Sequence, residues 1–253
     1  MQKIRINFLS HSGSNIVAEL NLPDSGEAKY IILYAPCFTC PRNIRYLNNM
    51  SKEFTDNGVG IFRFDFPGLG ESEGKFEDTN FTTNLINIRL AYQYLKANYS
   101  APSFCVGHSM GGAAMLKVAR EFAEVKAVAV IAAPYKPNNL AKTIAKTKAE
   151  ADLVGSSNVI IGDTEFTLTK EFFADLELTS GEHNIAELGK PLLVLHSPDD
   201  KTVSMDNAFK IFADAQEPKS LIQLNNFGHL MMRNESEARK VGKIIMAWCE
   251  QWL

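Results

Sequence analysis

The segment "GHSMG", residues 107–111, has the residue types and the spacing of a turn that presents a nucleophilic serine. Such a turn needs a strand before it and a helix after it, and here an apolar run precedes the motif and a helical pattern follows it. The glycines allow a sharp, strained turn that lifts the hydroxyl of Ser109 above a sheet. Because the motif alone arises by chance in about one chain of this length in ten, its context carries the prediction.

A serine nucleophile needs a base, and the base needs a carboxylate to orient it. In folds that use this turn, the order along the chain is serine, then Asp or Glu, then His. An apolar run ends at Asp199 and Asp200, and a later one ends just before His229. The five histidines are His11, His108, His183, His196 and His229, and only the last follows the acidic pair. The order therefore predicts His229 as the base and leaves both aspartates open as its partner.

Length, composition and charge exclude several other classes of function. The chain has 253 residues, 45% of them hydrophobic, and a formal charge of −3. Its Lys and Arg are scattered rather than gathered in a stripe, so we expect no nucleic-acid partner. No apolar run is long enough to span a membrane, and the N-terminus lacks the pattern of a signal peptide. We therefore expect a cytoplasmic protein that does not associate with membranes.

The apolar runs alternate with amphipathic segments, which predicts an α/β fold. Alternating patterns at 3–9 and 15–22 predict an antiparallel hairpin. Strands buried on both faces are predicted at 30–35, 60–64, 104–107, 125–132, 192–196 and 221–224, and helices at 44–55, 85–97, 113–121, 205–213 and 235–252. This order favours a mostly parallel central sheet with helices on both faces.

One segment, at about 135–190, departs from the alternation. It is polar and rich in Lys, and it carries a hairpin pattern of its own around the turn residues Gly162 and Asp163. Insertions of this size between core strands are usually functional, such as a lid over a site. The pattern leaves open whether this one is a lid or a surface elaboration.

Several segments carry a resemblance to a known family. They are "CFTC", "FRFDFPGLGESEG", "TNFTTNL", "GHSMGGAA" and "DNAFKIFADAQEPKSLIQL". With them the chain resembles α/β-hydrolases, and in particular the hydrolase portion of bifunctional α/β-hydrolase/OsmC family proteins. The resemblance implies an α/β-hydrolase fold for a single domain over residues 1–253, with a small lid or cap insertion at about 135–190. It also implies a functional link to an OsmC-like, peroxide-reducing protein.

The resemblance implies roles for further residues. The family carries its acid in a His-x-x-x-Asp-x-x-Val pattern, which His196, Asp200 and Val203 match, so it favours Asp200 over Asp199. It places the two donors of an oxyanion hole at the backbone N–H groups of Phe38 and Met110. The loop at 65–74 and the side chain of His108 are interpreted as structural.

Cys37 and Cys40 form a C-x-x-C pair directly after a predicted strand. A structural role in the loop and a redox role both stay open for them. A zinc site needs four ligands, and neither Cys105 nor Cys249 supplies a second pair with suitable spacing, so we expect no metal.

Together these patterns predict a serine hydrolase of the carboxylesterase type that cleaves small acyl esters through an acyl-enzyme on Ser109. No cofactor is expected. A thioesterase or a peptidase would use the same triad, and a redox-linked module would use the cysteine pair. We expect an apolar substrate pocket lined by Phe66, Phe81, Phe166 and Met231. Exposed edge strands near the N-terminus make a homodimer conceivable.

Overall fold

The computed structural model describes residues 1–181, 184–231 and 235–253, so His183 lies outside the described residues. An eight-stranded sheet runs in the order β1-β2-β4-β3-β5-β6-β9-β10. β1 (Gln2–Leu9) and β2 (Asn15–Leu22) form the expected antiparallel hairpin, and β2 pairs antiparallel with β4 (Gly60–Phe64). The remaining pairings described in this sheet are parallel, which confirms the mostly parallel sheet with an antiparallel N-terminal hairpin.

The central strands are buried on both faces, as their unbroken apolar runs predict. Every residue is buried in β3 (Ile31–Ala35), β4, β5 (Phe104–His108), β6 (Ala127–Ile131) and β9 (Leu192–His196). The edge strand β10 (Lys219–Gln223) is partly exposed, because it has a neighbour on one side only. The carboxyl ends of the parallel strands meet at one edge of the sheet, where such folds bind their ligands.

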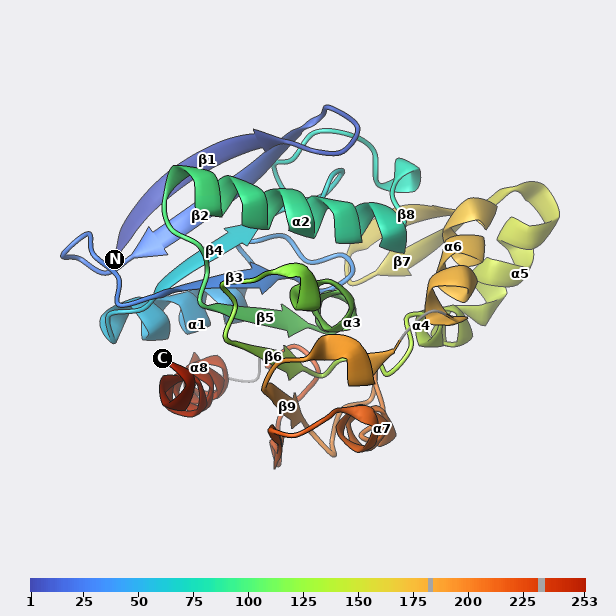
Figure 1. Ribbon diagram of the computed structural model, residues 1–253. Coiled ribbons are helices and arrows are strands. Elements are labelled where there is room, and N and C mark those ends of the chain that lie inside the picture. The colour runs from blue at the N-terminus through green and yellow to red at the C-terminus, as the bar shows by residue number, and fades with distance from the viewer. Residues whose placement is uncertain (182–183, 232–234) are drawn as a thin grey trace.

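Helices cover both faces of the sheet (Figure 1). The helices α1 (Arg45–Asp56) and α8 (Glu235–Cys249) pack together on one face, while α2 (Phe81–Asn98), α3 (Met110–Val118) and α7 (Asp206–Asp214) contribute to the hydrophobic core on the other. Short 3-10 turns, η1 (Phe76–Asp78), η2 (Ala119–Glu121) and η4 (Glu250–Trp252), flank these helices. Among the described helices, none is long and apolar enough to cross a membrane.

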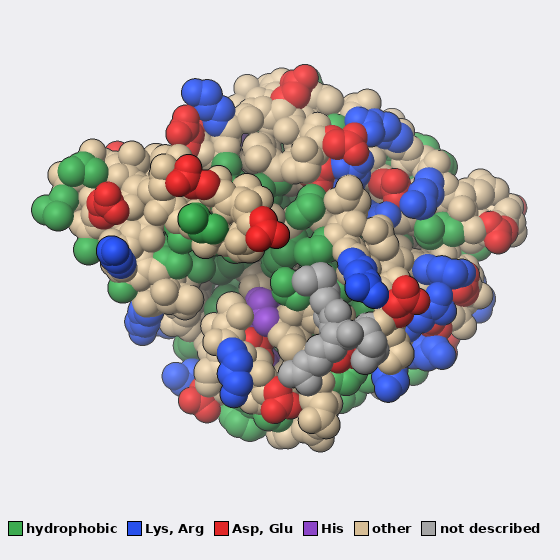
Figure 2. Space-filling view, turned by 180° about the vertical axis from the view of Figure 1, so that it is seen from behind, with side chains coloured by type: hydrophobic (Ala, Val, Ile, Leu, Met, Phe, Trp, Pro, Cys, Tyr) green, Lys and Arg blue, Asp and Glu red, His purple; other side chains and the backbone are tan. Residues whose placement is uncertain are grey.

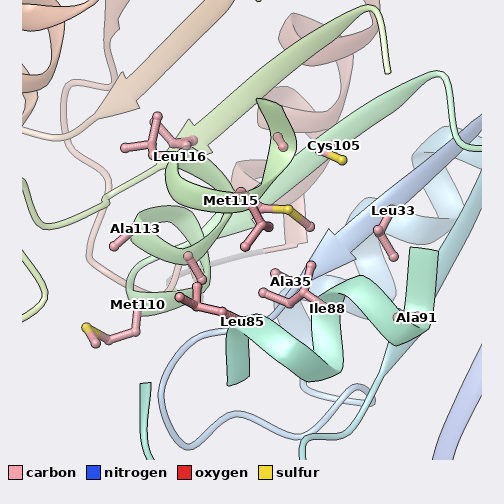
Figure 3. Close-up of a cluster of buried hydrophobic side chains, with 14 of the residues drawn as sticks. Leu33, Ala35, Leu85, Ile88, Ala91, Cys105, Met110, Ala113, Met115 and Leu116 are labelled. Carbon is pink, nitrogen blue, oxygen red and sulfur yellow. The ribbon is translucent and has the colours of Figure 1, made fainter. Parts of the chain in front are cut away.

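The core beneath α2 and α3 fixes the position of the serine turn. Figure 3 shows Leu85 and Ile88 of α2 beside Ala35 of β3, with Met115 of α3 in the same cluster. Full burial of one such side chain contributes about 1.5–3 kcal/mol, so this packing holds α3 firmly against the sheet. Ser109 immediately precedes α3 and is positioned with it.

Most of the segment between β6 and β9 forms a lobe at one side of the sheet, in yellow and orange in Figure 1. The lobe contains α4 (Asn139–Thr143), α5 (Ala145–Val154), β7 (Ser156–Ile161), β8 (Thr164–Thr169) and α6 (Lys170–Gly181). The segment ends with η3 (Ile185–Leu188), which contacts α3 and α7 instead. The hairpin β7–β8 confirms the predicted turn, where Gly162 has a φ of +63°. Because side chains of this lobe, among them Phe172 and Leu176, belong to the main hydrophobic core, the lobe is fixed to the sheet.

Candidate active site

Ser109 lies in a strained turn between β5 and α3. Its φ of 53° and ψ of −123° are unusual for a residue with a side chain, and its N–H donates to the carbonyl of Ile131 over 2.8 Å. The flanking glycines are required by close backbone approach. A Cβ atom at Gly107 would overlap the carbonyl oxygen of Gly111, and one at Gly111 would overlap the carbonyl oxygen of Pro36. The sequence therefore specifies a turn in which the Ser109 hydroxyl faces away from the sheet.

The structure brings the predicted triad together. The Oγ of Ser109 lies 3.1 Å from Nε2 of His229, and Nδ1 of His229 lies 2.7 Å from Oδ2 of Asp200. The other oxygen of Asp200 accepts the backbone N–H groups of Thr202 and Val203 at 2.8 and 3.0 Å. A carboxylate only accepts here, so Nδ1 of His229 carries a proton and Nε2 is left to face the serine.

Asp200 is buried, yet it is held in its charged form. Burial by itself would raise the pKa of Asp200, but the hydrogen bond and charge of His229 and the two backbone donors lower that pKa below its usual value. Asp199 serves a different purpose, because its Oδ2 accepts the N–H of Asn226 over 2.8 Å and so fixes the loop before the histidine. The geometry thus pairs the base with Asp200 rather than with Asp199.

His108, which was interpreted as structural from the sequence, contacts the loop that carries His229. Its Nε2 lies 2.8 Å from the backbone carbonyl oxygen of His229, and its Nδ1 lies 3.1 Å from the hydroxyl of Tyr46. Since a carbonyl only accepts, Nε2 of His108 carries the proton and Nδ1 accepts from Tyr46, which in turn accepts from Tyr34 over 3.3 Å. Burial lowers the pKa of His108 to about 3, so this chain of hydrogen bonds is held by a neutral ring.

His196 ties down the loop that carries the acid in a similar way. It ends β9, and its Nε2 lies 2.8 Å from the carbonyl oxygen of Val203, three residues beyond Asp200. Burial lowers the pKa of His196 as well. Each triad loop is therefore fixed to the end of a strand by a buried imidazole. The chain order that singled out His229 gave no sign of these two contacts, although both histidines stand at strand ends next to motif residues.

The residues predicted for an oxyanion hole lie at the same place. Phe38 and Met110 line the same cavity as Ser109. Met110 is the first residue of α3, and the first N–H groups of a helix have no acceptor within the helix. Within the described part of the chain, no hydrogen bond uses the N–H of Phe38 or of Met110. Both donors are thus available to a ligand.

The loop that carries Phe38 is fixed at both ends. The structure joins Cys37 and Cys40 in a disulfide, with their Cα atoms 5.2 Å apart, and the N–H of Cys40 donates to the carbonyl of Cys37 over 3.3 Å. Beyond it, the backbone N–H and the guanidinium of Arg42 both bind the fully buried carboxylate of Asp65. Asp65, the first residue of the loop at 65–74, thus holds the end of the loop that carries Phe38, which agrees with the structural role expected for it.

A cavity of about 800 Å³ opens above Ser109 and His229. Figure 2 shows a hollow between the protruding lobe and the rest of the molecule, with hydrophobic side chains and a histidine inside it. Of the four predicted pocket residues, only Met231 lines this cavity.

The other three predicted pocket residues belong to the hydrophobic core instead. Phe66 packs edge-on against Phe64 at 5.0 Å, Phe166 packs against Phe76 at 4.7 Å, and Phe81 is buried at the start of α2. The prediction was wrong for these three because each ring has an aromatic or aliphatic partner that turns it away from the cavity. The chain offers Leu140, Ile144, Ile161 and Leu230 as cavity side chains in their place.

Comparisons with known proteins identify the family. Residues 42–157 match the family described as serine aminopeptidase, S33. The esterase domain of a Rhodothermus marinus protein is 35% identical, with a TM-score of 0.78, over all of this chain and 99% of that one. The ferulic acid complex of Est1E from Butyrivibrio proteoclasticus is 19% identical, with a TM-score of 0.77 over 96% of this chain and 98% of that one, and it supports the fold alone.

Curated relatives match over part of their length. Human protein ABHD12B is 27% identical over 65% of this chain and 44% of that protein. The zebrafish (Danio rerio) lysophosphatidylserine lipase ABHD12 is 25% identical over 76% of this chain and 48% of that protein. The chain thus spans less than half the length of these relatives, and the narrower resemblance to α/β-hydrolase/OsmC proteins stays a prediction. The full-length match to the esterase domain, together with the sheet order and the serine turn, shows that this chain is a hydrolase of the α/β-hydrolase superfamily.

Proposed function

We propose that the protein is a serine esterase that cleaves acyl esters through an acyl-enzyme on Ser109. One observation carries the proposal: Ser109 and His229 line an accessible cavity, and hydrogen bonds join Ser109 to His229 and His229 to the buried Asp200. Acyl transfer requires a nucleophile joined to a base and the base joined to an orienting acid, and here the two hydrogen bonds are 3.1 and 2.7 Å.

The first half of the reaction forms the acyl-enzyme. Oγ of Ser109 attacks the ester carbonyl carbon while Nε2 of His229 takes the hydroxyl proton. The carbonyl oxygen becomes an oxyanion, which the N–H groups of Phe38 and Met110 stabilise by hydrogen bonds. When the tetrahedral intermediate collapses, the bond to the alcohol oxygen breaks and His229 gives its proton to that oxygen.

The second half repeats the same steps with water. His229 takes a proton from water as the water oxygen attacks the acyl carbon, and then returns it to Oγ of Ser109 as the acid leaves. Throughout, Asp200 stabilises the imidazolium form, and its lowered pKa keeps it charged for that role. His108 holds the backbone of the base in place through the carbonyl oxygen of His229.

The names of the similar proteins favour esters over other acyl substrates. The full-length match is an esterase domain, and the zebrafish relative is named a lipase. The family description instead names a serine aminopeptidase, and the same triad would serve a thioester. The triad does not encode the leaving group, so the choice of substrate class is decided by assay.

A matched panel of acyl compounds tests the proposal. The same butyryl group is offered as a 4-nitrophenyl ester, as a thioester and as an anilide, with alanyl anilide added for aminopeptidase activity. We expect turnover of the ester, loss of that turnover in Ser109→Ala, and normal turnover in Ser100→Ala, which removes an exposed hydroxyl elsewhere. Turnover of the anilides in preference to the ester would contradict an esterase and support a peptidase.

A further inference from the structure

The lining of the cavity above Ser109 has two chemically different parts, an apolar wall and a polar wall defined by their residues. One is apolar and is built from the oxyanion loop, the lobe and the loop of the base, with Phe38, Leu140, Ile144, Ile161, Leu230 and Met231. The other is polar and is built where α4 meets α7, with Asn139, Lys142, Thr143, Ser204, Asn207 and Lys210. The lining thus offers a substrate both apolar side chains and two lysines.

The two lysines are placed by a contact between the helices. Nδ2 of Asn139 donates to Oδ1 of Asn207 over 2.7 Å, and the same oxygen accepts the backbone N–H of Tyr135 over 3.0 Å. This contact joins α4 to α7. Residues three apart on a helix share a face. Lys142 therefore lies on the same face of α4 as Asn139, and Lys210 lies on the same face of α7 as Asn207. Both lysines thus lie one turn away from the same contact, on the faces that line the cavity.

The charges of these lysines are not neutralised by neighbouring side chains. Both are exposed, and among the residues that the structure describes no carboxylate oxygen lies within the 4.0 Å of an ion pair from either one. Asp206 is the one acidic residue among the described lining residues, and it stands four positions before Lys210 without pairing to it. The polar wall therefore keeps a net positive charge, which is unfavourable unless a ligand or salt compensates it.

We propose that the cavity takes esters that carry a negatively charged group, a carboxylate or a phosphate, which the ammonium groups of Lys142 and Lys210 bind while the ester carbonyl lies at Ser109. This rests on the proposed esterase function and adds the substrate class to it. The apolar wall holds the uncharged part of the substrate. Because charge pairs at exposed positions are weak, the pair of lysines is expected to favour an anionic ester by about two- to tenfold.

The test compares kcat/KM for matched anionic and neutral esters. On the acyl side, 4-nitrophenyl monoesters of dicarboxylic acids of increasing length are compared with the same compounds capped as methyl esters. On the alcohol side, 4-acetoxybenzoate and 4-acetoxyphenyl phosphate are compared with methyl 4-acetoxybenzoate. The two series show on which side of the ester the charge is recognised, and the phosphate separates the two kinds of anion.

The variants are Lys142→Gln, Lys210→Gln and their combination, with Lys142→Arg and Lys210→Arg as charge-conserving partners. Lys126→Gln is the control, because Lys126 is exposed just before β6, at the opposite end of that strand from the site. We expect the ratio of kcat/KM for anionic over neutral esters to fall by about two- to tenfold in the double Gln variant. The ratio should stay at its wild-type value in the Arg variants and in the control. Added salt should lower the ratio of the wild type.

The proposal would be overturned if neutral esters are cleaved but the ratio of kcat/KM for anionic over neutral esters is the same in the wild type and in the double Gln variant in every series. If the wild type cleaves none of the esters, the proposed esterase function itself is wrong. The two failures are distinguished by the neutral esters.

Discussion

At the scale of single residues, the site depends on which of two adjacent aspartates faces the base. Asp200 binds Nδ1 of His229 and two backbone N–H groups, whereas Asp199 binds the N–H of Asn226. The sequence alone left the pair open, because both carboxylates follow the same strand. The resemblance favoured Asp200, and the structure pairs that residue with the base.

We predict that Asp200→Asn lowers kcat for the ester substrate by on the order of 10⁴-fold, because an amide favours the wrong tautomer of His229. Asp199→Asn is the matched control, since it makes the same chemical change one residue away and keeps the carboxylate that binds His229. The measurement is steady-state kinetics of both variants on one ester. Equal losses in the two variants would contradict the assignment of the acid.

A second residue-scale prediction concerns His108. In His108→Phe the carbonyl of His229 loses a buried hydrogen bond worth about 1–3 kcal/mol, and we expect kcat to fall by about tenfold or more. His108→Gln keeps a donor and should recover part of that loss. Turnover within twofold of the wild type in His108→Phe would mean that the contact does not position the base.

The same substitution changes the pH dependence of stability. The pKa of His108 falls from 6.5 in the unfolded chain to about 3 in the folded protein. Between these values the unfolded chain binds a proton that the folded protein does not. The stability that the neutral His108 contributes is therefore fully present above pH 6.5 and is lost as the pH falls toward 3. We expect the free energy of unfolding to fall less steeply over this range in His108→Phe, as measured by urea unfolding at several pH values.

At the scale of elements, the oxyanion loop is the part that the sequence described least well. The Cys37–Cys40 disulfide closes the loop around Phe38, and the Arg42–Asp65 ion pair holds the chain just beyond it. Phe38 packs against Phe76 at 5.3 Å and Phe172 at 5.4 Å. The C-x-x-C spacing left a structural and a redox role open. The disulfide encloses Phe38, whose N–H is a proposed oxyanion donor, so a structural role and a redox role would both affect the position of that donor.

We predict that reduction of this disulfide by a phosphine, which supplies two electrons as the two sulfurs take up two protons, lowers kcat by about tenfold. That is short of the hundredfold or more that removal of an oxyanion donor costs, because Arg42 still anchors the loop. The double variant Cys37→Ser with Cys40→Ser should have the same reduced kcat and no response to the reductant. A wild type that keeps its full activity when reduced would leave the disulfide with no part in the reaction.

Helix boundaries show what else the sequence carried. The helix expected from Leu85 begins at Phe81, because Asn80 and Thr83 form reciprocal capping hydrogen bonds that the apolar pattern did not include. By contrast, β4 and β9 have the predicted bounds. Gly60 begins β4, and the polar residues Asp65 and Ser197 directly follow β4 and β9.

At the scale of the whole molecule, the alternation of strands and helices was sufficient to predict the fold class, but not the cavity. The order of the strands within the sheet was not predicted. The order of residues along the chain predicted Ser109 and His229, and the family resemblance selected Asp200. Which phenylalanines line the cavity depends on side-chain direction and on the position of the lobe between β6 and β9, and neither is encoded in local periodicity. The same holds for the contact between Asn139 and Asn207, whose residues lie 68 positions apart.

The most direct test of the whole account is the intact mass of the protein after incubation with a fluorophosphonate probe, for the wild type, Ser109→Ala and Ser100→Ala. The account predicts a single adduct on the wild type and on Ser100→Ala, and none on Ser109→Ala, because only a serine activated by His229 attacks the probe. A folded wild type that forms no adduct, or an adduct that persists in Ser109→Ala, would contradict it.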